Sequence, residues 1–263
     1  MSTKTKKNKQ YASIITVLLI LISILAIVSI KKLIPIYSIS DRTQKVLKKS
    51  QEDDTVFAWL RVQGTNIDYP VVYSFTEKFR NEEYDYDYLW TNSNSTTLND
   101  RVIVWGHNIR NVSSQPLINQ KEFNYFENLP SFLYYDFVKD NKYILYTINK
   151  KNYLYKIYSV SMVDKNEFSN NENMNKEDKE EYIKKTIEES YFDFDVEVEP
   201  NKKIITLATC TRFGGSKDVI IKIDGVMVDE NEKVLNYKVK KKKQYEKIEK
   251  TMKGDGDYDK EEA

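Results

Sequence analysis

Short strand-like segments rich in apolar residues recur along the chain after residue 55 and predict a β-rich domain. Residues 57–62 and 67–73 are strand-like on either side of a turn at 63–66, and residues 149–152 are the predicted turn of a hairpin. The other strand-like runs are residues 101–106, 142–148, 153–163, 203–210, 218–223 and 226–228. So many short strands with little helix predict a closed or nearly closed β barrel.

Two segments follow a helical pattern instead. Residues 176–190 place Tyr182, Ile183, Thr186 and Ile187 on one stripe, which predicts an amphipathic helix on the surface of the barrel. Residues 40–53 contain few apolar side chains and predict an exposed helix. We expect this second helix to act as a spacer before the β-rich domain.

Residues 11–30 form a run without charge that predicts a membrane anchor. At about 1.5 Å per helical residue the run spans roughly 30 Å, the thickness of a bilayer core. It is longer than the apolar region of a secretory signal peptide and no small-residue cleavage site follows, so an uncleaved anchor is favoured over a cleaved signal. Four lysines precede the run and two follow it, which favours a cytoplasmic N-terminus with the rest of the chain outside the cell.

The C-terminal segment differs in composition from the rest of the chain. Residues 238–263 contain a basic block, an acidic end and few large apolar side chains, which predicts a solvated tail that is either disordered or a mobile helix. Lysine contacts with anionic lipid or other polymers are the less favoured alternative. The chain therefore divides into an N-terminus (1–10), an anchor (11–30), a helical linker (31–54), a barrel (55–230) and a tail (231–263).

The composition narrows the possible functions. Lysine and arginine total 41 against 40 acidic residues, so the net charge of +1 gives no reason to expect a nucleic-acid partner. A single cysteine allows neither an intramolecular disulfide nor a zinc site built on several cysteines. The acidic residues at 81–87 lack the spacing of a calcium-binding loop, and no metal or other cofactor is predicted.

The only cysteine and the only histidine occupy similar positions. Cys210 ends the predicted strand 203–210, and His107 follows the predicted strand 101–106. A thiol with an ordinary pKa of about 8.5 is mostly protonated at neutral pH, and a nearby imidazole raises its thiolate fraction. A lone cysteine is more often a small buried apolar side chain than a nucleophile. The shared position at strand ends nevertheless makes the two residues a candidate catalytic pair.

Three segments around these residues resemble the sortases, and together they resemble class B sortases. They are residues 59–72 (WLRVQGTNIDYPVV), 105–108 (WGHN) and 206–210 (TLATC), which follow the family's order and approximate spacing. The helix predicted at 176–190 and the N-terminal anchor also match that class. The resemblance implies a mainly β fold, namely a closed eight-stranded sortase-type barrel with a few peripheral helices, preceded by one transmembrane helix.

The resemblance also implies an activity and assigns residues to it. Sortases are cysteine transpeptidases that cleave a C-terminal sorting signal of the LPXTG or NPXTN kind, and the resemblance implies no cofactor. Cys210 would attack the threonine carbonyl and form a thioacyl enzyme. His107 would protonate the departing amine and later deprotonate the incoming one. Thr209 resembles the family threonine that helps to hold the substrate, and Leu207 and Asn108 are further candidate substrate contacts.

The sequence departs from the family at the third catalytic residue. The family arginine usually opens the strand after the cysteine, where residues 216–221 of this chain read SKDVII. Arg212 is one alternative, because it would lie on the same side of an extended chain as Cys210. Lys217, also a candidate substrate contact, would act as a point charge with poorer geometry. We expect Arg212 to stabilise the oxyanion.

Three functions follow from this resemblance. The favoured one is a membrane-anchored, extracellular enzyme of a Gram-positive bacterium that transfers surface proteins bearing a sorting signal to a peptidoglycan precursor or cross-bridge amine. A pilin-polymerising sortase would use a pilin lysine as the acceptor instead. A catalytically weak module that binds sorting signals without turnover is the third alternative, because the family arginine is displaced.

Overall fold

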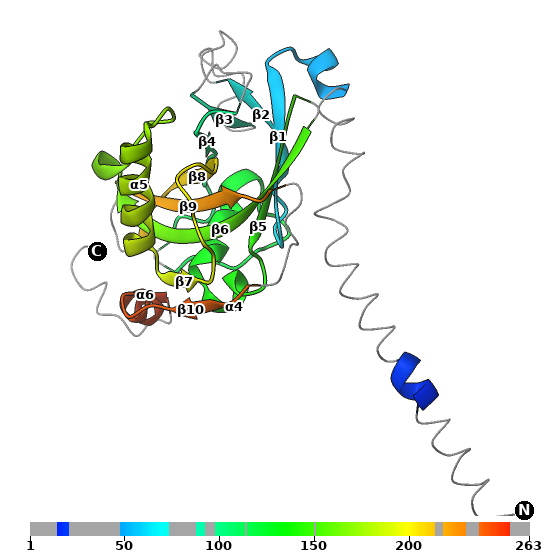
Figure 1. Ribbon diagram of the computed structural model, residues 1–263, viewed down its shortest axis with the longest axis vertical. Coiled ribbons are helices and arrows are strands. Elements are labelled where there is room, and N and C mark those ends of the chain that lie inside the picture. Colours follow the sequence, from blue (N-terminus) through cyan, green and yellow to red (C-terminus); the bar gives the residue numbers. More distant parts are fainter. Residues whose placement is uncertain are drawn as a thin grey trace, which may run out of the picture. The chain divides into compact units, whose positions relative to one another are not determined.

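The computed structural model describes residues 15–20, 48–73, 88–92, 98–113, 115–149, 151–213, 218–229 and 237–252 (Figure 1). The chain separates into two units, Met1–Ser40 and Asp41–Ala263. In the first unit, residues 15–20 are helical and their apolar side chains are exposed. No helix within the described ranges has the length and apolar character needed to cross a membrane. The anchor predicted at 11–30 lies mostly outside these ranges and stays a prediction.

The second unit is built around a closed barrel of eight strands, which confirms the predicted barrel (Figure 1). In order around the barrel, the strands are β1 (Val56–Val62), β2 (Asp68–Tyr73), β3 (Leu89–Thr91), β4 (Arg101–Trp105), β8 (Ile204–Thr211), β9 (Val219–Met227), β6 (Lys151–Asp164) and β5 (Tyr143–Ile148). The pairs β2–β3 and β4–β8 are parallel. The C-terminal ends of β4 and β8 therefore lie side by side.

Strand β1 shows why the predicted strands form. Successive side chains of a strand point to opposite faces, so a period of two separates the core face from the other face. The fully or almost fully buried side chains of β1 follow this period: Val56, Ala58, Leu60 and Val62. The residues between them are half-buried. The alternation in burial therefore marks the inner face of the barrel, although Phe57 and Trp59 on the other face are apolar as well.

The turn between β5 and β6 is shorter than the predicted turn at 149–152. Strand β6 begins at Lys151, which pairs directly with Ile148. Asn149 has a φ of 51°, a left-handed conformation that asparagine adopts more readily than most residues. The hairpin is thus confirmed with a tighter connection.

The sequence predicts two strands where the structure has the single strand β9. Asp224 and Gly225 have the composition of a turn, but both pair with β8 in regular register and with β6 on either side of a register shift between Ile157 and Ser159. A Cβ at Gly225 would lie only 3.1 Å from the Cβ of Tyr155, so the strands pack closely at this position. The local composition fails here because the barrel places a small residue and a buried charge in mid-strand.

A buried polar cluster joins the barrel to helix α5 (Lys176–Glu189). Arg101 and Asp224 are both fully buried, and Thr206 lies between them. Thr206 Oγ1 accepts a hydrogen bond from Arg101 Nε at 2.8 Å and donates one to Asp224 Oδ1 at 2.5 Å. Tyr182 on α5 donates to the same carboxylate oxygen at 2.6 Å. These bonds connect β4, β8, β9 and α5.

Helix α5 confirms the predicted amphipathic helix, with one change in its buried face. Tyr182, Ile183 and Thr186 are buried as expected, but Ile187 is 39% exposed. Lys179 is buried in its place and completes a stripe at positions i, i+3, i+4 and i+7. Burial lowers the pKa of Lys179 from its usual value.

The C-terminal segment is folded where the sequence predicts a mobile tail. Strand β10 (Val239–Lys241) pairs with β7 (Phe192–Phe194) in a small second sheet, and helix α6 (Tyr245–Met252) follows. Tyr245, Ile248 and Met252 are buried along one side of α6. Few apolar residues suffice because their spacing matches the helix, which average composition does not detect. The disordered alternative is therefore wrong for residues 237–252, whereas helix α6 agrees with the helical alternative. Residues 253–263 lie outside the described part of the chain.

Short helices between β4 and β5 were not predicted. They are the 3-10 helix η1 (Tyr125–Leu133) and helix α4 (Tyr135–Val138), and a second 3-10 helix, η2 (Lys165–Glu167), follows β6. Nearly all of η1 is buried, including the polar residues Glu127 and Asn128. Pro130 lies inside η1 and interrupts the apolar periodicity that would predict a helix.

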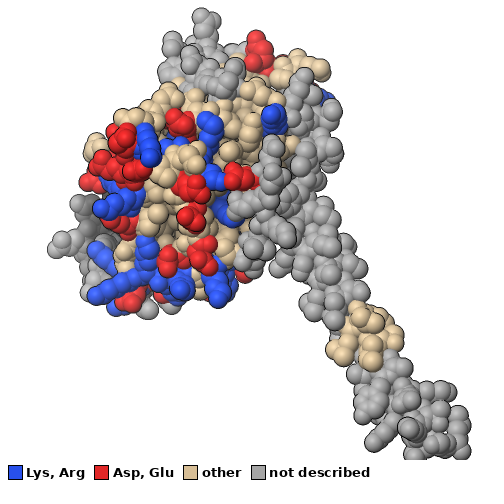
Figure 2. All heavy atoms as spheres, viewed as in Figure 1, with Lys and Arg blue, Asp and Glu red and all other residues tan. Residues whose placement is uncertain are grey.

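Charged side chains of both signs share the surface. Figure 2 shows lysines and arginines interspersed with aspartates and glutamates on the visible face. Some form ion pairs between elements, such as Lys222 with Glu189 and Lys241 with Glu249, each at 2.8 Å. This mixture matches the nearly balanced total charge of the chain.

Candidate active site

The predicted pair, Cys210 and His107, lies at the C-terminal ends of two adjacent strands. In the parallel pair β4–β8, Trp105 is opposite Ala208. His107 comes two residues after Trp105, and Cys210 comes two residues after Ala208. The two residues therefore occupy equivalent positions beyond this strand pair. Neighbouring strands are about 4.8 Å apart, so the two residues leave adjacent strands at the same level of the sheet.

The side chain of Cys210 is exposed, whereas those of its neighbours are not. Cys210 is the penultimate residue of β8, and both Thr209 and Thr211 are buried. The alternation of a strand explains this pattern. His107 is half-buried just beyond β4. An accessible thiol beside an imidazole suits a nucleophile, and the exposure rules out the alternative that Cys210 is buried core filler.

Hydrogen bonds from adjacent side chains join the two strands around this pair. Thr209 Oγ1 donates to the carbonyl oxygen of Gly106 at 2.6 Å. In the opposite direction, Asn108 Nδ2 donates to the carbonyl oxygens of Cys210 at 3.2 Å and Asn111 at 2.8 Å. Asn108 and Thr209 are 7% and 0% exposed. In this conformation both side chains are bonded to the protein rather than presented to a substrate.

Trp90 is a site residue that the sequence analysis did not identify. Its ring centroid lies 4.8 Å from that of His107, at an interplanar angle of 45°. Trp90 is on β3 and is opposite Trp105 of β4, so strand pairing places it beside the histidine. An aromatic face beside an imidazole restrains its orientation and attracts its protonated form. A tryptophan within a polar segment was the one available signal in the sequence.

Gly106 occupies a position where a larger residue would collide with its neighbours. A Cβ would lie 2.6 Å from Leu89 Cδ2 and 2.7 Å from Phe126 Cγ. The substitution Gly106→Ala is therefore expected to lower the free energy of unfolding by about 1–3 kcal/mol and to displace the adjacent His107. Thermal unfolding measures the first effect, and the NMR signal of the single histidine reports the second. An unchanged melting temperature would contradict this close packing.

The segment after His107 is held by a buried carboxylate. Glu127 of η1 accepts hydrogen bonds from the Arg110 backbone N–H at 3.0 Å and from Arg110 Nη2 at 2.7 Å. Burial alone would raise the pKa of Glu127, but hydrogen bonds from Arg110 and Asn124 outweigh burial and hold the pKa below its usual value. Asn111 Nδ2 also donates to the Glu127 carbonyl oxygen at 2.9 Å. The segment is thus tied to η1.

The remaining predicted site residues, Arg212, Lys217 and Leu207, differ in where the structure places them. Arg212 directly follows β8 with an exposed side chain, and the buried Thr211 precedes it, so alternation places Arg212 on the same side as Cys210. Lys217 lies outside the described residues. Leu207 is fully buried and is paired on both sides by β4 and β9. The predicted substrate contact at Leu207 is therefore corrected to a core position.

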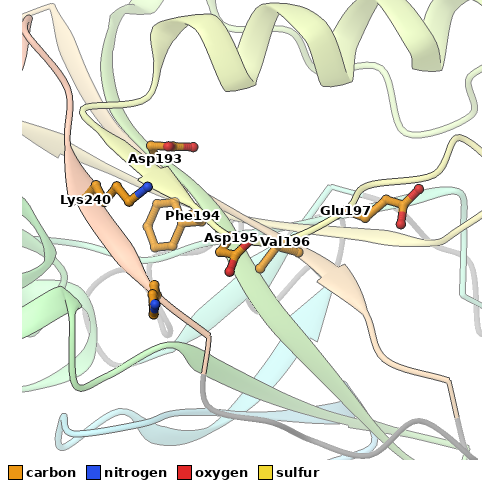
Figure 3. Close-up of a pocket in the computed structure, with 7 residues that line it drawn as sticks. Asp193, Phe194, Asp195, Val196, Glu197 and Lys240 are labelled. Carbon is orange, nitrogen blue, oxygen red and sulfur yellow. The ribbon is translucent and has the colours of Figure 1, made fainter.

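A pocket of about 410 Å³ lies at the β7–β10 sheet, and none of the predicted site residues lines it (Figure 3). Asp193 of β7 and, after the end of that strand, Asp195 and Glu197 line one side of the pocket, and Lys238 and Lys240 line the other. Asp193 is opposite Lys240 in the ladder, so the charges face each other across the sheet. Within the described ranges, no group of three or more His, Cys, Asp or Glu residues is placed to hold a metal ion.

Comparison with known proteins identifies the family. The family model for the Sortase domain matches residues 60–226. This chain belongs to the sortase family. The sortase is 25% identical over 173 residues to Sortase B of Listeria monocytogenes, and this match covers 62% of the chain and 65% of the relative. The match therefore spans slightly less than two thirds of the length of that relative.

Solved class B sortases share the fold of this sortase. The structure of Clostridium perfringens sortase B has a TM-score of 0.58 at 24% identity, with 70% of this chain and 99% of that chain covered. A Staphylococcus aureus sortase B–substrate complex has a TM-score of 0.57 at 18% identity, with 73% and 93% covered. At these identities the likeness concerns the fold. The resemblance to class B sortases stated from the sequence is thus confirmed by both kinds of relative.

Proposed function

We propose that this sortase is a cysteine transpeptidase in which Cys210 is the nucleophile and His107 transfers protons. The observation that supports the proposal is the register of β4 and β8, in which the only histidine and the only cysteine each come two residues after the same strand pair, with Cys210 exposed. The sequences around both residues support the proposal, because they resemble the sortase motifs. Membership in the sortase family supports the same chemistry.

The proposed reaction consists of two acyl transfers. The Cys210 thiolate attacks the carbonyl carbon of the scissile peptide bond, and the C–N bond breaks as His107 gives a proton to the departing amine. An incoming amine then attacks the thioacyl carbon and loses a proton to His107. The C–S bond breaks and restores the thiolate. Atoms and charge balance without a further reactant.

Arg212 is the group that stabilises the oxyanion in this proposal. Its exposed side chain lies on the Cys210 side of the chain directly after β8. Removing one oxyanion donor typically costs about 10²–10³-fold in kcat, so Arg212→Ala is expected to reduce peptide cleavage by this factor. Lys217→Ala is the matched control, with a loss of less than about threefold expected. Steady-state cleavage of a labelled peptide measures both, and the opposite ranking would assign the role to Lys217.

The substrate and the acceptor are proposed from the resemblance. The sortase would cleave an LPXTG-like or NPXTN-like signal on surface proteins and transfer them to a peptidoglycan precursor or cross-bridge amine. A related sortase B has been solved as a substrate complex, which supports a substrate-binding role for this fold. The charge-free run at residues 11–30 supports an anchored enzyme with its barrel outside a Gram-positive cell.

The proposed function is tested by intact-mass analysis of the protein without residues 1–40, incubated with LPXTG-like and NPXTN-like peptides. The expected result is a thioacyl adduct with one of the two peptides, which then transfers to an added amine such as triglycine. The peptide that reacts identifies the signal, and the amine that resolves the adduct identifies the acceptor class. The absence of an adduct with every peptide would overturn the proposal.

The displaced arginine favours one other function, a module that binds sorting signals without turnover. Residues 216–221 contain no arginine where the family usually has one. Measurable peptide binding without an adduct, in the same experiment, would support this second function. An adduct that forms and resolves would exclude it.

A further inference from the structure

We infer that Asn108 and Thr209 are positioning residues that set the alignment of Cys210 and His107. Asn108 follows the histidine and bonds to the carbonyl of the cysteine. Thr209 precedes the cysteine and bonds to the carbonyl of Gly106, which precedes the histidine. The two bonds therefore cross between the strands in opposite directions and enclose the reactive pair. This inference rests on the proposed function and assigns both residues a role other than substrate contact.

Backbone pairing alone holds the strands weakly at this point. The register of β4 and β8 ends with Trp105 opposite Ala208. The next backbone bond, from Gly106 N to the Ala208 carbonyl, is 3.4 Å long, against about 2.9–3.0 Å for an ordinary N–H···O bond. The Thr209 bond of 2.6 Å comes directly after this long bond. Beyond the end of the backbone pairing, the side-chain bonds of Thr209 and Asn108 therefore hold the two strand ends together.

The orientation of the Asn108 amide is fixed by its partners. Nδ2 faces two carbonyl oxygens, those of Asn111 and Cys210, and only the nitrogen can donate to them. Oδ1 is buried and has no hydrogen-bond partner within the described residues. An unpaired buried acceptor costs free energy, which an apolar side chain would avoid. The unpaired oxygen makes the asparagine unfavourable at this position, and its two donated bonds are what the side chain provides in return.

The Asn108 amide also connects the pair to the mostly buried 3-10 helix η1. Its bond to the Asn111 carbonyl leads to η1, because Asn111 Nδ2 donates to the Glu127 carbonyl. Glu127 is 4% exposed and is itself held by Arg110. Misplacing reacting groups by about 1 Å can cost roughly 10²-fold in rate, so this support acts on the rate and not on substrate affinity.

The test compares Asn108→Ala and Thr209→Val, singly and together, with Thr209→Ser. We expect each single variant to lower kcat for peptide transfer about 10–100-fold with KM changed less than about threefold. Thr209→Ser keeps the hydroxyl and should stay within about threefold of the unaltered protein. Because both bonds set one geometry, the double variant should lose less than the product of the single losses. Thr147→Val removes a buried hydroxyl from β5, away from this pair, and is the matched control.

A second readout needs no substrate. The rate at which iodoacetamide alkylates Cys210, the only thiol, is measured from pH 5 to 9, together with the NMR titration of the only histidine. In Asn108→Ala and Thr209→Val we expect alkylation near neutral pH to slow at least about threefold, since a displaced imidazole supports the thiolate less. Thr147→Val should leave the profile unchanged, although it lowers the melting temperature.

The outcomes separate the two claims. A raised KM with unchanged kcat would overturn the inference and make Asn108 or Thr209 a substrate contact. Unchanged kcat and unchanged alkylation profiles would overturn it as well. If the unaltered protein forms no adduct with any peptide, the proposed function fails, but the alkylation profiles still decide whether the two side chains align the thiol and the imidazole.

Discussion

Replacing Cys210 with alanine is expected to abolish the thioacyl adduct and to reduce peptide cleavage by about 10³-fold or more. Cys210 is the only thiol in the chain, so no other side chain can form the same intermediate. A loss of this size follows because the nucleophile makes the covalent bond on which both acyl transfers depend. Intact-mass analysis measures the adduct, and chromatography of the labelled peptide measures the cleavage.

The folded state should tolerate this change. Cys210 is exposed at the end of β8, and substitutions at exposed positions usually alter the free energy of unfolding by less than about 0.5 kcal/mol. An unchanged melting temperature therefore separates lost chemistry from lost structure. Cys210→Ser is the matched variant of nearly equal size and should also form no thioacyl adduct. Cleavage retained by Cys210→Ala would exclude Cys210 as the nucleophile.

The strands and the main helix could be predicted because their patterns are local. β1 and β8 are both short, largely apolar runs, so each is visible within a window of a few residues. Helix α5 shows its period in the same way. Closure of the barrel follows from the number of short strands, since a sheet that closes leaves no unpaired edge.

The errors arise where tertiary contacts override local composition. Asp224 and Gly225 resemble a turn, yet they lie inside β9, because Thr206 and Tyr182 bond the carboxylate and the close packing against Tyr155 favours a glycine. Residues 237–252 are polar on average, but the spacing of their apolar side chains suits a strand and a helix. The average composition of a segment contains neither the hydrogen-bond partners of a residue nor the spacing of the apolar side chains.

The candidate site was predictable in its chemistry and not in its geometry. The single cysteine and single histidine, with the motifs around them, indicated the reaction class. The register that places Trp105 opposite Ala208 is a property of the folded barrel. A slip of one residue would turn Cys210 to the inner face and Leu207 to the outer face. The contact between Trp90 and His107 depends on strand pairing in the same way.

Replacing Asp224 with alanine is expected to lower the free energy of unfolding by about 3 kcal/mol or more. The carboxylate is fully buried, accepts hydrogen bonds from Thr206 and Tyr182, and lies 4.0 Å from Lys222 Nζ. Without it, two buried hydroxyls lose their acceptor and the buried cations Arg101 and Lys222 lose a nearby negative charge. Urea denaturation measures the change, and melting should occur about 6–12 °C lower.

Asp193→Ala is the matched control for this change. Asp193 is exposed on β7, so the same substitution there should cost less than about 0.5 kcal/mol. If Asp224→Ala cost no more than Asp193→Ala, the buried cluster would not stabilise the barrel. A large loss of free energy of unfolding for Asp224→Ala alone would show that this residue, where the sequence predicts a turn, belongs to a polar cluster that stabilises the core.

The substitution Asp224→Ala is also expected to disturb the geometry of the candidate active site. The cluster holds the first part of β4 and β8, and pairing continues from Arg101 opposite Ile204 to Trp105 opposite Ala208. Because Cys210 and His107 come directly after this ladder, loosening its start should disturb their alignment. The rate of adduct formation by Asp224→Ala, measured where the variant is still folded, should therefore fall below that of Asp193→Ala. Equal rates would show that the alignment depends on the local bonds of Asn108 and Thr209 alone.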